Sequence, residues 1–110
     1  MIDCLAIGDE MAIRMADLIG CKPWASFGRS AFDQVALIRQ IRADRVLISL
    51  GTYPSHYSDP NLVADMLYVR SKISARQVVW ILPKKPEARD AVRFVASMYR
   101  DVLVEVGGAL

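Results

Sequence analysis

Short apolar runs alternate with segments of helical spacing along the whole chain, and this alternation most limits how the chain can fold. The runs short enough to be strands are Ile2–Ile7, Cys21–Phe27, Arg45–Leu50, Gln77–Leu82 and Val102–Val106. The helical segments between them are Glu10–Ile19, Ser30–Ala43, a third opened by Asp59-Pro60, and Pro86–Arg100. Strands that alternate with helices pair in parallel through right-handed crossovers. The pattern predicts an α/β fold of three layers, α/β/α, with a five-stranded parallel sheet of order 2-1-3-4-5.

Residue types within the runs predict where each strand lies in that sheet. The run Val46–Leu50 is apolar at nearly every position, which suits a strand covered on both faces. Pro23 cannot donate a ladder hydrogen bond, so Cys21–Phe27 is expected to be a short edge strand. The last strand is also expected to be an edge, one that needs cover from another subunit. The apolar residues behind that expectation are Val104, Val106 and Leu110.

Apolar residues at helical spacing predict which side of each helix faces the sheet. They are Met11, Met15, Leu18 and Ile19 in the first helix, Ala31, Val35 and Ile38 in the second, Leu62, Met66, Val69 and Ile73 in the third, and Ala88, Val92, Val95 and Tyr99 in the fourth. Gly20 is the expected stop of the first helix. Asp59 and Pro60 fit the N-cap and first turn of the third.

Composition bounds the class of protein. A chain of 110 residues, 54% apolar and 24% charged, is expected to form one globular domain over residues 1–110. The net charge is +2 and the 14 Lys and Arg residues are spread over the helical segments, so nucleic acid is not the expected partner. No apolar run approaches the ~20 residues of a membrane span. Met1 precedes a strand with an acidic residue rather than a signal peptide.

The two cysteines stand far apart in sequence, Cys4 inside the first strand and Cys21 just past the first helix. Two widely spaced thiols make neither a metal site nor a disulfide framework by pattern. Both are expected to be small buried apolar residues. Neither a metal nor a cofactor is expected.

Three glycine-containing turns follow the first three strands: Gly8–Glu10, Phe27–Arg29 and Gly51–Ser58. In a parallel sheet of this order, ligands bind at the carboxyl ends of the strands, near the switch point between strands 1 and 3. The three turns are therefore expected to meet there and to form the candidate site.

These turns resemble the first three blocks of the SGNH (GDSL-type) hydrolase family. The residues that carry the resemblance are Ile7-Gly8-Asp9-Glu10, Gly28, and Leu50-Gly51-Thr52-Tyr53; Val79–Pro83 is similar to small, often phage-encoded members. The resemblance runs from Ile2 to Val106 and implies a flavodoxin-like fold. In the family a serine after Gly-Asp is the nucleophile. Two backbone N–H groups and an asparagine form the oxyanion hole, and a histidine beyond the last strand is the base.

The chain departs from this pattern at the residues that do the chemistry. Gly8, Asp9, Gly28 and Gly51 match, but Glu10 stands at the nucleophile position. The variable position is Thr52, and Tyr53 replaces the asparagine, followed by Pro54. No aspartate or histidine follows Asp101. Acyl transfer needs an activated nucleophile and aimed donors, so the resemblance implies that this activity is lost.

The function expected on this basis is a non-catalytic structural or protein-binding module, in the cytoplasm or as a component of a phage virion or its assembly. Its partners would be other proteins or further copies of itself. The alternative is a residual or altered esterase that uses Glu10, Asp9 or His56. A nucleotide or phosphate binder has only the generic strand–glycine–helix turn in its favour.

Several residues near the turns have two interpretations. Asp9 and Glu10 are either a catalytic acid pair or acids that cap the first helix. Trp24, Tyr53, His56 and Tyr57 are either contact residues on one rim or side chains that fill the vacated pocket. Lys84 and Lys85, with Arg29, either attract an anionic partner or form solvated turns.

Overall fold

The structure is a computed structural model, and it describes residues 2–52 and 61–105. Its elements are β1 Ile2–Gly8, α1 Glu10–Ile19, β2 Lys22–Ala25, α2 Ala31–Leu37, β3 Ile41–Ser49, α3 Leu62–Ser71, β4 Ile73–Ile81, α4 Pro86–Tyr99 and β5 Val102–Val104. The strands form one parallel sheet of order β2-β1-β3-β4-β5. The predicted fold class and strand order are confirmed.

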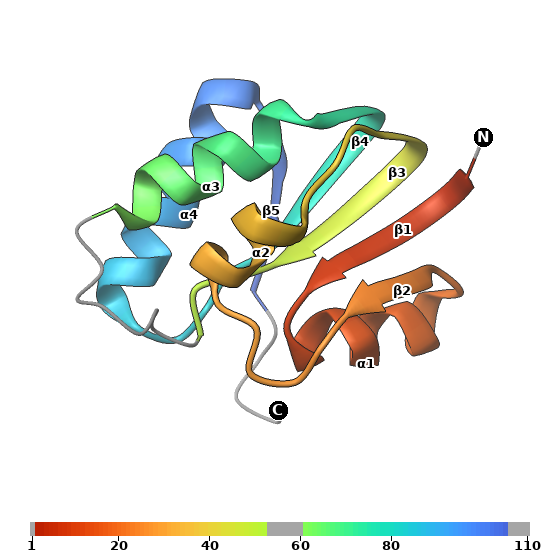
Figure 1. The fold of residues 1–110 in the computed structure, drawn as a ribbon, viewed down its shortest axis with the longest axis horizontal. Helices are drawn as coiled ribbons and strands as arrows, with labels where there is room; N and C mark the ends of the chain where they lie inside the picture. The colour runs from red at the N-terminus through yellow and green to blue at the C-terminus, as the bar shows by residue number, and fades with distance from the viewer. Residues whose placement is uncertain (1, 53–60, 106–110) are drawn as a thin grey trace.

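The helices divide unequally between the two faces of the sheet. Figure 1 shows α1 on one side and α2, α3 and α4 together on the other. The three-helix face holds the larger core, built on Trp80, Ile48 and Met66, all fully buried. None of the helices within residues 2–52 and 61–105 has the length and apolar character that a bilayer crossing needs.

The single-helix face is thinner. On it, α1 turns a different side toward the sheet from the one that the sequence predicted. Ala12 and Ala16 are buried and pack in a small cluster with Ala6, Leu47 and Ile81. Leu18, predicted to face inward, is 74% exposed, and Ile19 is 47% exposed. Alanine lets a helix approach a sheet closely, and the helix therefore turns its small residues inward. The larger apolar stripe, including Met11 and Met15, is left on the flank of α1.

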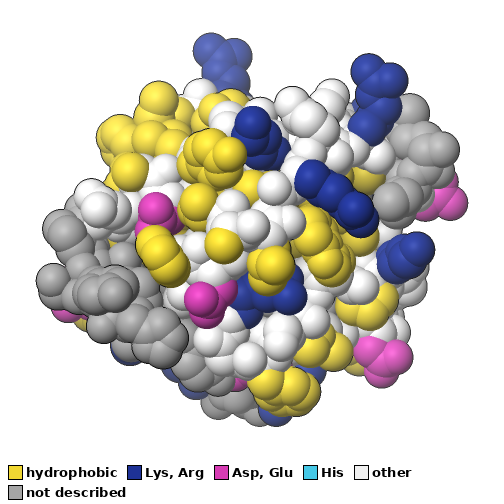
Figure 2. Space-filling view, viewed as in Figure 1, with side chains coloured by type: hydrophobic (Ala, Val, Ile, Leu, Met, Phe, Trp, Pro, Cys, Tyr) yellow, Lys and Arg dark blue, Asp and Glu magenta, His cyan; other side chains and the backbone are white. Residues whose placement is uncertain are grey.

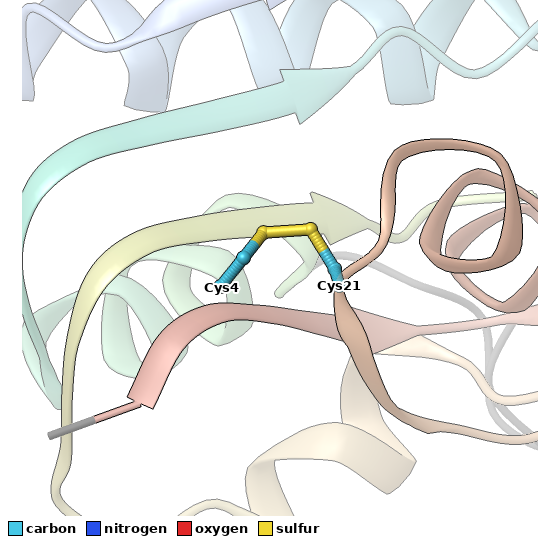
Figure 3. The surroundings of a disulfide bond; sticks show 2 residues. All are labelled: Cys4 and Cys21. Atoms are coloured by element: carbon cyan, nitrogen blue, oxygen red, sulfur yellow. A yellow bond between two sulfur atoms is a disulfide. The ribbon is translucent and has the colours of Figure 1, made fainter.

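A disulfide joins Cys4 and Cys21 across this thin face, so the prediction of two separate buried thiols is wrong (Figure 3). The register explains the pairing. Leu5 in β1 lies opposite Lys22, the first residue of β2. Cys4 and Cys21 each come one residue earlier, so they lie side by side. Their Cα atoms are 4.7 Å apart, within the range that a disulfide spans. Sequence spacing could not reveal this because α1 separates the two cysteines along the chain.

The boundary between α2 and β3 is also corrected. The helix expected over Ser30–Ala43 ends at Leu37, and the strand expected from Arg45 begins at Ile41. Ile41 pairs with Ile73 in β4, and Ala43 pairs with Ile2 in β1. These ladders draw residues of helical pattern into the sheet, because tertiary pairing outweighs local propensity. Strand β4 is lengthened in the same way and begins before the expected Gln77.

The predicted stop of the first helix is confirmed, since Gly20 ends α1 in the left-handed conformation. Ser30, expected as the first residue of the second helix, is instead the N-cap of α2 and forms a reciprocal capping box with Asp33. The cap predicted at Asp59-Pro60 is wrong, because α3 begins at Leu62 with Asn61 as its N-cap. Asp59 and Pro60 themselves lie outside the described residues, as do Val106 and Leu110. Tyr99, predicted to face inward, is 40% exposed, with the Arg70 guanidinium 4.2 Å from its ring centre.

A buried ion pair lies on the three-helix face, at the end opposite the carboxyl ends of the strands. Arg70 in α3 makes two hydrogen bonds to Asp101, of 2.7 and 2.9 Å. The indole N–H of Trp80 donates to the same carboxylate at 3.0 Å. The side chains of Arg70 and Asp101 are only 12% and 4% exposed. Paired and hydrogen-bonded charges of this kind are tolerated in a core, and removing one partner costs far more than the pair contributes.

Candidate functional site

The carboxyl ends of β1 and β3 come into direct contact at the candidate site. Gly8 has φ +123°, and a Cβ there would overlap the carbonyl oxygen of Ser49. That same oxygen accepts a hydrogen bond of 3.0 Å from the Asp9 N–H. Only glycine permits this close approach, and it places Asp9 between the two strand ends.

Asp9 is fully buried and acts as the N-cap of α1, as predicted. Its Oδ1 accepts from the Met11 N–H at 3.1 Å and from the Ser49 hydroxyl at 2.7 Å. Its Oδ2 has no hydrogen-bond partner within the described ranges. Burial raises the pKa of the Asp9 carboxyl, and the bonds from Ser49 and Met11 partly oppose that rise. Asp9 therefore holds the turn together at an electrostatic cost.

Glu10 bridges the first and second turns. It occupies the first turn of α1, where an acid is favoured by the helix dipole. Its Oε2 accepts a hydrogen bond of 3.3 Å from the Gly28 backbone N–H. A carboxylate that belongs to the chain itself thus occupies a backbone donor that the family resemblance assigns to an oxyanion.

The third turn begins as expected, although most of it lies outside the described residues. Gly51 is buried with φ +101°, and a Cβ there would meet the Ala88 Cβ at 2.9 Å. Thr52 follows at the mouth of the site and lines its pocket. Tyr53, His56 and Tyr57 lie outside the described residues, so their predicted roles stay predictions.

Trp24 and Arg29 do not line the pocket that lies between α1 and the carboxyl ends of β3 and β4. Trp24 is half-buried against the three-helix core, with the Arg39 guanidinium 5.3 Å from its ring centre. Arg29 donates to the Trp24 carbonyl at 3.3 Å and to Gln34 Oε1 at 3.0 Å. Arg29 is therefore held on the β2–α2 side and does not line the pocket with Lys84 and Lys85. Whether these cations attract an anionic partner or form solvated turns stays a prediction.

A pocket of about 370 Å³ opens beside α1 at the strand ends. Its wall consists of Glu10, Met11 and Arg14, and Ser49 and Thr52 close the end by β3. The segment Ile81–Lys85, which follows β4, forms the rest. The lining combines apolar side chains with the cations of Arg14, Lys84 and Lys85. It contains Glu10 as its only lining carboxylate among the described residues.

Two residues that line this pocket, Ser49 and Arg14, were not predicted from the sequence to do so. Ser49 is the one polar residue of the run Val46–Leu50, a visible signal that its hydroxyl has a partner. Arg14 reaches the pocket because α1 turns its alanines to the sheet, and nothing in the sequence indicates that rotation. Within residues 2–52 and 61–105, no group of three or more His, Cys, Asp or Glu side chains is arranged to hold a metal ion.

Comparison with known proteins adds no relative: no protein-family model, no curated protein and no solved structure matches the chain. The resemblance to SGNH hydrolases thus stays a prediction that rests on the turn residues.

Proposed function

We propose that the chain is a non-catalytic, SGNH-hydrolase-like domain that serves as a structural or protein-binding module. The hydrogen bond from the Gly28 N–H to Glu10 Oε2 carries this proposal. Acyl transfer needs empty donors that face the developing oxyanion. Here the donor is engaged by a fixed negative charge, which also repels an anion that forms beside it.

The surface supports a binding role. Large apolar side chains stand out on several elements of the described chain: Phe27 is 75% exposed, Leu18 74% and Met98 60%. Hydrophobic side chains also gather over α3 and the adjoining part of α4, at the upper left of Figure 2. Exposed apolar patches with polar surroundings are typical of protein contacts.

The disulfide supports a place outside the reducing cytosol. Disulfides persist in oxidising surroundings and are rare in cytosolic proteins. Of the two predicted locations, a virion or another particle exposed to oxidising conditions agrees better with the Cys4–Cys21 bond. A phage virion component is therefore the form of the proposal that we favour.

An altered esterase is the second candidate, and one contact favours it. The Ser49 hydroxyl lies at the pocket and donates to Asp9 Oδ1 at 2.7 Å, and Asp9 has a raised pKa. A hydroxyl hydrogen-bonded to a carboxylate base is one arrangement of an activated nucleophile. Ser49 is only 3% exposed, which argues for a structural role.

An ester-hydrolysis assay separates the two functions. The purified chain is incubated with p-nitrophenyl acetate beside three variants, Glu10→Gln, Glu10→Ser and Ser49→Ala. We expect no turnover above buffer for the native chain. Native turnover that disappears in Glu10→Gln or Ser49→Ala would overturn the binding proposal. Turnover that appears only in Glu10→Ser would leave the binding proposal standing, because the native chain would still be inactive and its Glu10 would be what blocks the site.

A further inference from the structure

The sheet face beside α1 is only half covered. Helix α1 lies against β1, β2 and β3. No helix within the described residues lies over β4 and β5 on this side (Figure 1). Val79 on this face is half-buried, and its neighbour Val102 in β5 is 42% exposed. Parallel sheets are normally covered on both faces, so this strip is a site where another element can pack.

The flank of α1 continues the same apolar surface. Met11 and Met15 are half-buried against the small cluster, and Leu18 stands 74% exposed one turn further on. Residues at spacings of three and four share one side of a helix. Met11 and Arg14 line the pocket, so this side of α1 faces the uncovered strip. This apolar surface meets the pocket of about 370 Å³ at its strand end, and the pocket and the surface are together called the groove below.

Cations outnumber carboxylates at the strand end of this groove, by three to one among the described lining residues. Arg14, Lys84 and Lys85 line it, and its lining carboxylate, Glu10, accepts from the Gly28 N–H. A second copy that docked symmetrically through the same face would bring the same cations into the groove, and like charges across an interface are disfavoured. An acidic segment is complementary instead.

We propose that the groove between α1 and β4–β5 binds an amphipathic helix of a partner protein, with an apolar face and acidic flanks. The apolar face of that helix packs on Met11, Met15 and Val79, and its acidic residues lie beside Arg14 and Lys85. Helix-in-groove recognition uses apolar anchors at spacings of three, four and seven residues, and Met11, Met15 and Val79 offer apolar contacts for such anchors. The inference rests on the proposed binding function and names its partner chemistry.

The test uses two synthetic peptides of about 18 residues, long enough to form a helix. Both have leucines at helical spacing; one carries glutamates on its flanks and the other lysines. Backbone amide NMR shifts of the disulfide-bonded chain are followed during titration with each peptide. We expect shifts at Met11–Leu18, Ile81–Lys85 and Val102 with the acidic peptide. Its affinity should exceed that of the basic peptide by at least about tenfold.

Matched variants locate the site. Arg14→Glu with Lys85→Glu should weaken acidic-peptide binding by about tenfold or more, whereas Arg93→Glu, an exposed position of α4, should leave it unchanged. Equal binding of both peptides, no binding, or shifts confined to α3 and α4 would overturn the inference. These outcomes leave the proposed function standing. Native esterase turnover that is lost in Glu10→Gln would overturn the proposed function without altering the peptide map.

Discussion

The two faces of the sheet are stabilised by different means. The three-helix face has large buried side chains such as Trp80 and Met66 and a paired buried charge, Arg70–Asp101. The single-helix face has alanines, a disulfide between Cys4 and Cys21, and an aspartate cap, Asp9, that no described cation accompanies. One face thus depends on packing, and the other on a covalent bond.

This difference teaches where the chain leaves part of the sheet itself uncovered. The inner faces of the three helices are used in the core, and the exposed apolar residues of that face, such as Phe94 and Met98, lie on the outer side of the helices. A helix that packs through alanines leaves its larger apolar residues on its flank. The proposed groove lies on the face that the chain itself covers least.

The largest expected effect is on the three-helix face. Asp101→Ala leaves the Arg70 guanidinium buried and unpaired and removes the acceptor of the Trp80 N–H. We expect a loss of about 3–5 kcal/mol in the free energy of unfolding. Urea denaturation measures it. The matched control is Asp44→Ala, which removes the exposed Arg76–Asp44 pair and should change stability by less than about 1 kcal/mol. Similar losses in both variants would contradict the comparison.

The next effect concerns the thin face. Replacing Cys4 and Cys21 together by alanine should lower the free energy of unfolding by about 2–4 kcal/mol, because the bond restricts the unfolded chain between residues 17 positions apart. Thermal or urea unfolding with and without reductant gives the same comparison in the native chain. If reductant changes native stability by less than about 1 kcal/mol, the alanine packing suffices and the bond is not what stabilises this face.

These expectations show which parts of the fold the sequence could supply. Strand order followed from the alternation of runs, and α1 was bounded correctly because Gly20 is a usual helix stop and Asp9 is a residue type that caps helix starts. The early end of α2 could not be predicted from the sequence, because Ile41 and Ala43 are part of a strand only through their pairing with β4 and β1. The same holds for the disulfide, which depends on strands that meet only in three dimensions.

The candidate site was predicted in part. The sequence identified the glycine turns, and it identified Asp9 as a cap because acids at helix starts follow a local rule. The Gly28–Glu10 hydrogen bond joins residues 18 positions apart, so no local pattern indicates it. The orientation of α1, which decides whether Arg14 lines the pocket, depends on how closely alanines let the helix approach the sheet.

A smaller effect is expected from the charge on Asp9. Because the folded state raises the pKa of this carboxyl above 3.8, the native chain binds a proton more readily than the unfolded chain. The contribution of Asp9 to stability is therefore greatest below pH 3.8 and falls as pH rises through the raised pKa. Asp9→Asn keeps an acceptor for Met11 and Ser49 without the charge. The free energy of unfolding of Asp9→Asn, minus that of the native chain, should be larger at pH 7 than at pH 3.5. Urea unfolding of both proteins at both pH values measures this difference.

The opposite sign, with Asp9→Asn relatively worse at pH 7, would mean that the charged carboxylate itself stabilises the turn. Ser49→Ala is the companion variant, since it removes the hydroxyl that favours the charged form. It should raise the pKa of Asp9 further, which NMR titration of the carboxyl measures directly.

The smallest effect is expected on the exposed flank of α1. Leu18→Gln should change the free energy of unfolding by less than about 0.5 kcal/mol, because the side chain is 74% exposed. Phe94→Gln, at a 52% exposed position of α4, is the matched change on the other face. A loss above about 1 kcal/mol for Leu18→Gln alone would show that this residue packs within the chain and is not available to a partner.

The disulfide also changes the connectivity of the molecule. Cys4, α1 and Cys21 form a closed covalent ring that contains all of Glu10–Ile19. A protease that cuts after the exposed Arg14 opens this ring without dividing the molecule, since the bond still joins the two pieces. Such a nicked chain would migrate as one species until it is reduced, and only then would it separate into two fragments.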